Sequence, residues 1–199
     1  MHRRRWMGWG LCLALAMPAM GMAQQTMGTQ AAAAGPIAPA DSLGALLNLM
    51  EMEVVSAADA MPAEKYDFAP STSIGLYAGV RSFSAQVKHL AEANYEFFAP
   101  WGGPGVVDAK SIEALKTKDD IMKALKDSYA YAHQAVNTIT PENAFVPLPG
   151  PFARLKGTRA SLAAFAMAHS MDHYGQLVEY LRMNGIVPPA SRPRPGTTM

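Results

Sequence analysis

Apolar residues recur three and four positions apart along four stretches of the chain, which is the spacing of one face of an α-helix. These stretches are residues 42–60, 82–98, 118–139 and 158–184. Thr158 is suited to cap the start of the last helix, and Pro62 and Pro141 end the first and third. No stretch shows convincing strand-like alternation. The pattern therefore predicts an all-α protein, built as a four-helix bundle.

The apolar faces of these helices form the candidate core. In the first helix, the expected buried face consists of Leu43, Leu46, Leu47, Met50, Val54, Ala57 and Met61. In the last helix, it consists of Leu162, Phe165, Ala166, His169, His173, Gln176, Leu177 and Tyr180. The second of these faces mixes apolar side chains with two histidines, so it is a candidate for a functional site as well as for the core.

The connections between the predicted helices are long and carry several Pro and Gly residues. They include Pro70, the segment APWGGPG at 99–105 and the segment PLPGP at 147–151. Loops this long inside a compact domain are often functional or cover a site. The expected architecture is therefore a bundle with long inter-helix connections.

The first residues have the pattern of a secretory signal peptide. Three arginines at 3–5 precede an apolar run over residues 6–17, and Gly-Met-Ala at 21–23 matches a cleavage site. Cleavage is expected after Ala23, and the apolar run is too short for a comfortable transmembrane helix. We therefore expect a periplasmic or secreted protein with no stable membrane span after cleavage.

Composition divides the remaining chain into three parts. Residues 24–40 are rich in Ala, Gln and Pro and are expected to form a flexible leader. Residues 41–187 hold the four predicted helices. Residues 188–199 form a Pro-rich tail that is expected to be disordered.

Charge and cysteine content narrow the classes of function. The formal net charge is only +1, and no basic stripe is present, so a nucleic-acid partner is not expected. Removal of residues 1–23 takes away three arginines, no acidic residue and the only cysteine, Cys12. The mature chain then has a net charge of −2 and no thiolate. Any metal would have to be held by nitrogen and oxygen ligands.

His169 and His173 lie four residues apart in the last helix, so both imidazoles fall on one face, one turn apart. Such a pair can chelate one metal ion, although the spacing alone is a weak motif. A zinc protease would carry Glu after the first histidine, and Ser170 stands there instead. Two hydrogen-bonded core histidines remain the alternative to a metal site.

Met167 and Met171 alternate with these histidines, which raises the alternative of a copper site with soft ligands. On a helix, the two methionines fall about 160° and about 200° from His169. They therefore lie on the opposite side and are expected to fill a second buried face.

A third ligand would have to come from His89 or His133. His89 shares its helix face with small and polar residues, so periodicity leaves two alternatives, a solvated face or a face open to a pocket. His133 lies at the edge of the apolar face of the third helix and is expected to be a boundary histidine.

At this point the chain resembles the DinB family, also described as DinB/YfiT-like metalloenzymes. The resemblance is carried by SFSAQVKHLAEANYEFF at 82–98 and HSMDHYGQLVEYLRMNGIVPP at 169–189, with support from AEKYDFAPS at 63–71. It covers nearly all of residues 40–189. One departure is Tyr174, where many relatives carry Arg, on a side of the helix that faces away from the histidines.

This resemblance implies a four-helix bundle with a three-histidine metal site made of His89, His169 and His173. Three neutral imidazoles leave a divalent ion with open positions, as in catalytic zinc sites. Zn²⁺ is the first choice, and Ni²⁺, Fe²⁺ or Mn²⁺ could substitute, because imidazole is not selective. Lining of the pocket, or support of the ligands, is expected of Asp172, Gln176 and Tyr180, with plain packing or solvation as the alternative.

Three functions follow from these expectations. The first is a metal-dependent enzyme acting on a small molecule, with hydrolysis by metal-bound water as the chemistry. The second is thiol-dependent S-transfer, which the resemblance implies for some members and which export disfavours. The third is a non-catalytic, stress-related bundle that binds a metal or ligand. The sequence identifies neither a catalytic residue nor a substrate. It is compatible with a homodimer.

Overall fold

The computed structural model describes residues 35–193, and within this range the chain is all-helical. The predictions for residues 1–23, for most of the leader and for residues 194–199 lie outside the described residues. The helices are α1 (Pro39–Ala60), α2 (Phe83–Phe98), α3 (Ala109–Glu113), α4 (Lys118–Val136) and α5 (Arg159–Met183). Three short 3-10 turns are η1 (Ala63–Lys65), η2 (Pro151–Leu155) and η3 (Pro189–Ser191). The predicted all-α class and the four long helices are confirmed.

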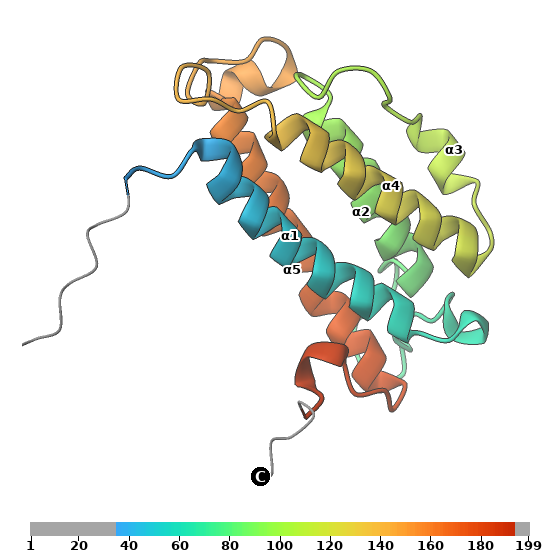
Figure 1. The fold of residues 1–199 in the computed structure, drawn as a ribbon. Coiled ribbons are helices and arrows are strands. Elements are labelled where there is room, and N and C mark those ends of the chain that lie inside the picture. Colours follow the sequence, from blue (N-terminus) through green and yellow to red (C-terminus); the bar gives the residue numbers. More distant parts are fainter. Residues whose placement is uncertain (1–34, 194–199) are drawn as a thin grey trace, which may run out of the picture. The chain divides into compact units, whose positions relative to one another are not determined.

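The four long helices form a bundle in which chain order and spatial order differ (Figure 1). α1 packs against α4 and α5, and α2 packs against the same two helices, so α1 and α2 lie diagonally opposite. A chain that crosses a bundle diagonally needs more residues than a hairpin turn. This explains the long connection at 61–82, and α3 occupies part of the connection between α2 and α4.

Helix starts follow the capping residues of the sequence. The side chains of Ser82, Thr117 and Thr158 accept hydrogen bonds from backbone N–H groups in the first turns of α2, α4 and α5. α1 begins at Pro39, three residues earlier than predicted, because Pro suits the first turn of a helix. Five-residue α3 was not predicted, since it is too short to show a helical period.

The core lies between the four long helices, and its largest fully buried side chains include Tyr129, Phe83 and Phe98. Two residues of the predicted faces are exceptions. Leu46 is 48% exposed and Phe165 is 52% exposed. Phe165 still packs edge-on against Phe97 of α2, with 5.1 Å between ring centroids. The remaining apolar residues of the expected α1 face are buried or half-buried.

The connection after α1 fixes the start of α2, the helix that carries His89. The backbone N–H of Phe83 donates to the carbonyl oxygen of Phe68 at 2.8 Å, and that of Ser84 donates to Tyr66 at 2.7 Å. These bonds satisfy N–H groups that a helix N-terminus leaves free. The start of α2 is thus tied to the segment after α1, where Phe68 also packs edge-on against Tyr180 of α5, with 5.7 Å between ring centroids.

The described part of the C-terminal tail contacts the bundle. η3 packs against α1, and Arg182 donates from Nη2 to the hydroxyl of Ser191 at 3.0 Å. Within residues 35–193, no helix is both long enough and apolar enough to cross a membrane.

Candidate metal centre

Three histidines from two helices meet in the seam between α2 and α5. His89 comes from α2, and His169 and His173 come from successive turns of α5. One nitrogen from each lies within 4.8 Å of the others. The ring centroids are 5.2 Å apart for His89 and His169, 4.9 Å for His89 and His173, and 4.6 Å for the α5 pair. The structure thus brings together the three residues that the resemblance to the DinB family implied for the site.

The other histidine of the described chain lies elsewhere. His133 Nε2 is 2.8 Å from the Glu51 carboxylate, on the α1–α4 side of the bundle. Tyr174 also faces away from the cluster, because its hydroxyl donates to Glu53 on α1 at 2.7 Å. Both placements match the expectations of a boundary histidine and of a tyrosine off the histidine face.

All three imidazoles favour the neutral form. Burial lowers the pKa of His89 and of His169 below the usual value. Burial, together with the nearby charges of His169 and His89, lowers the pKa of His173 to about 4. A neutral imidazole has a free lone pair on one nitrogen, which is the form that binds a metal ion.

Hydrogen bonding supports the fit to a metal ion. Nε2 of His169 and Nδ1 of His173 are buried and have no hydrogen-bond partner among the described residues. Buried polar atoms are nearly always paired, and leaving one unpaired costs about 1–3 kcal/mol. A cation bound by the three rings would satisfy these nitrogens. The alternative of three hydrogen-bonded core histidines does not account for them.

Neighbouring side chains surround the imidazoles. Glu92, one turn after His89, places a carboxylate oxygen 3.9 Å from Nδ1, which is longer than a hydrogen bond. Burial raises the pKa of the Glu92 carboxyl, and the nearby charge of Glu113 raises it further. On the other side, Phe97 packs edge-on against His169 at 5.3 Å between centroids. A carboxylate behind a ligand histidine is a common support in metal sites.

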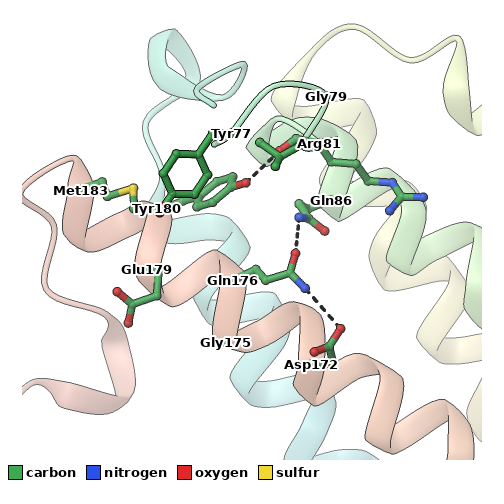
Figure 2. Close-up of a pocket in the computed structure, with 11 residues that line it drawn as sticks. Tyr77, Gly79, Arg81, Gln86, Asp172, Gly175, Gln176, Glu179, Tyr180 and Met183 are labelled. Atoms are coloured by element: carbon green, nitrogen blue, oxygen red, sulfur yellow. Dashed lines mark hydrogen bonds between the residues drawn. The ribbon is translucent and has the colours of Figure 1, made fainter. Parts of the chain in front are cut away.

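A cavity of about 900 Å³ opens beside the cluster, within the size range of small-molecule sites (Figure 2). The three supporting residues expected from the sequence, Asp172, Gln176 and Tyr180, all line it. No imidazole lines this cavity. A smaller hollow of about 320 Å³ reaches His89, and Arg81 lines both spaces.

Side-chain amides form a chain across the floor of the cavity (Figure 2). Gln176 donates from Nε2 to the Asp172 carboxylate at 3.2 Å, and Gln86 donates from Nε2 to Oε1 of Gln176 at 2.5 Å. An ionised carboxylate can only accept, so Asp172 sets the direction of both amides. Gln86 is 3% exposed, and its Oε1 is left without a partner among the described residues.

Sequence reasoning missed three residues beside the cluster, namely Arg81, Gln86 and Glu92. Gln86 and Glu92 lie three positions before and after His89, so both share its helix face. That polar face was open to interpretation as solvated, and the contact with α5 decides in favour of a pocket. Arg81 precedes α2 and gave no periodic signal.

Comparison with known proteins adds one finding. A family model described as the DinB superfamily matches residues 46–177, a span that includes all three histidines. No curated protein matches the chain.

Proposed function

Because this chain belongs to the DinB superfamily, we propose that it is a metal-dependent enzyme whose divalent ion is held by His89, His169 and His173. One observation carries the proposal. Three neutral imidazoles converge within 4.8 Å, and two of their buried nitrogens have no partner among the described residues. Zn²⁺ is the proposed ion, because three nitrogen ligands with open positions are typical of catalytic zinc sites.

Hydrolysis of a small molecule is the proposed reaction. When bound, a divalent ion supplies Lewis acidity, which polarises a carbonyl or phosphoryl group and activates water. The chain's own residues bind and orient. The cavity of about 900 Å³ accepts the substrate, Glu92 places a negative charge near His89, and the Asp172–Gln176–Gln86 chain fixes the cavity floor. Phe97 excludes water from one side of His169.

Elemental analysis of purified protein tests the metal site. We expect about one equivalent of a divalent metal in the wild type and a large loss in His169→Ala. His133→Ala is the matched control, since His133 pairs with Glu51 away from the cluster. Equal, near-zero metal in the wild type and His169→Ala would refute the site.

A second measurement separates an enzyme from a metal-binding bundle. The metal-loaded wild type is screened against ester, amide and phosphoester substrates, beside His169→Ala and His133→Ala. We expect hydrolysis that follows metal content across the three proteins. Full metal content without turnover of any substrate class, together with a fourth protein ligand in a metal-bound structure, would instead indicate a non-catalytic site.

We also propose that the enzyme acts in the periplasm or outside the cell, on the basis of the signal-peptide pattern at residues 1–23. Mass spectrometry of protein from the native host should give an N-terminus at Gln24. An intact N-terminus on protein in the cytoplasmic fraction would contradict export.

A further inference from the structure

Arg81 lines both of the spaces beside the histidine cluster. It lines the large cavity together with Gln86, Asp172 and Gln176, and it lines the small hollow together with His89 and Glu92. Its side chain is therefore placed to contact a molecule in the large cavity and one beside His89.

The backbone of Arg81 is held in place, whereas its side chain extends into the open space. Its carbonyl oxygen accepts a hydrogen bond from the Tyr180 hydroxyl at 3.1 Å, and the next residue, Ser82, caps α2. Figure 2 shows the guanidinium reaching past Gln86, away from the rings of Tyr77 and Tyr180. The guanidinium of Arg81 thus extends from a backbone position that hydrogen bonds hold in place.

The guanidinium of Arg81 has no ion-pair partner within 4.0 Å among residues 35–193. Four acids line the same two spaces, namely Asp172, Glu179, Glu92 and Glu113, and none of them lies within 4.0 Å of the guanidinium. Lys88, the other cation at the small hollow, donates to the backbone carbonyl oxygens of Glu113 and Leu115. Of the cations that line these two spaces, Arg81 is therefore the one left for a ligand.

We propose that Arg81 binds the carboxylate of the substrate, so that the substrate is a small organic acid. The proposal rests on the hydrolytic function proposed above and adds the class of molecule. A guanidinium offers paired N–H donors that match the two oxygens of a carboxylate.

Charge and shape of the cavity favour a monocarboxylate over a phosphate ester. Asp172 and Glu179 line the same space as Arg81, so a dianion would meet two negative side chains. The wall formed by Tyr77, Val80 and Met183 gives an apolar body a surface to pack against. A carboxylate on a hydrophobic or aromatic body fits both features.

Three probes of one shape test the proposal: benzoate, its uncharged analogue benzamide, and phenyl phosphate. Binding to the full chain is titrated by NMR in metal-free and zinc-loaded protein. In the metal-free series the probe cannot bind directly to a metal ion, so this series measures the contribution of Arg81 alone. We expect benzoate to bind metal-free wild type about tenfold or more tightly than Arg81→Gln, since charge-assisted hydrogen bonds are lost. Arg81→Lys should be intermediate, because the charge remains and the planar pair of donors does not.

Glu179→Gln is the matched control, since it removes a charge from the same cavity. It should leave benzoate binding unchanged or slightly tighter. Benzamide should bind the wild type and Arg81→Gln alike, which shows that the cavity is intact. Equal benzoate binding in the wild type and Arg81→Gln, or no benzoate binding at all, would overturn the proposal, as would tighter binding of phenyl phosphate than of benzoate.

Zinc content is measured on the same samples, so the two proposals fail separately. A wild type without zinc refutes the metal enzyme, and the metal-free titrations still decide the role of Arg81. Full zinc content, together with equal benzoate binding in the wild type and Arg81→Gln, refutes only the proposed substrate class.

Discussion

Gln86 on α2 donates a hydrogen bond to Gln176 on α5, with 2.5 Å between Nε2 and Oε1. Gln86 lies three residues before His89, and Gln176 lies three residues after His173. The two amides therefore join α2 and α5 about one helical turn from the imidazoles. This contact holds the helix spacing on which the convergence of the three rings depends.

Replacement of Gln86 by Leu should lower the free energy of unfolding by about 1–2 kcal/mol, because Gln176 loses its donor. Denaturant unfolding measures the change. Gln176→Leu should show a similar loss, and the double variant should lose about 1 kcal/mol less than the sum of the two, since only one bond is broken. Strict additivity would show that the contact contributes no stability.

Metal removal should destabilise the wild type and leave His169→Ala almost unaffected. Free metal at about 100 times its dissociation constant stabilises a folded protein by about 2.7 kcal/mol, which corresponds to about 5–10 °C in Tm for a domain of this size. Thermal unfolding with and without a chelator measures the shift. His133→Ala should keep the wild-type shift, and an equal chelator effect in His169→Ala would place the metal elsewhere.

The metal-free protein should lose stability in acid. Because folding lowers the pKa of His173 from 6.5 to about 4, the unfolded chain binds more protons between these values. The contribution of His173 to the free energy of unfolding should therefore be complete above pH 6.5 and decrease as the pH drops towards 4. His173→Gln should show a shallower fall in denaturant titrations across this range. A slope identical to that of the wild type would show that burial of His173 does not set it.

Tyr174→Phe should cost about 1 kcal/mol of stability without loss of metal. The hydroxyl donates to Glu53 on α1, on the side of α5 that faces away from the cluster. Denaturant unfolding and elemental analysis on one sample check both statements. A fall in metal content would show that the α1–α5 contact controls the position of the imidazoles.

The sequence predicted the helices well, because each long helix carries a clear apolar face and three of the four begin at a capping hydroxyl. It placed His169 and His173 together, since four residues on one helix fix their relation. It could not place His89 by periodicity, because a polar face has the same pattern whether it meets water or a second helix. The resemblance to the DinB family supplied that position.

The shape of the cavity could not be predicted from the sequence, for a different reason. Its walls come from the 61–82 connection, from α2 and from α5, and no local pattern tells how these segments meet. Arg81 stands outside any helix, so its position depends on the hydrogen bond from Tyr180, a residue far along the chain. Gln86 likewise gains its role only through Gln176.

The diagonal placement of α1 and α2 has a consequence for the folding of the chain during its synthesis. Both helices pack mainly against α4 and α5, which are synthesised later, and of the described helices made before α4 only the short α3 packs against α2. A nascent chain that ends before α4 therefore leaves most of two apolar faces uncovered, and such faces promote aggregation. The last segment to be made, α5, closes the bundle and delivers two of the three imidazoles in the same step.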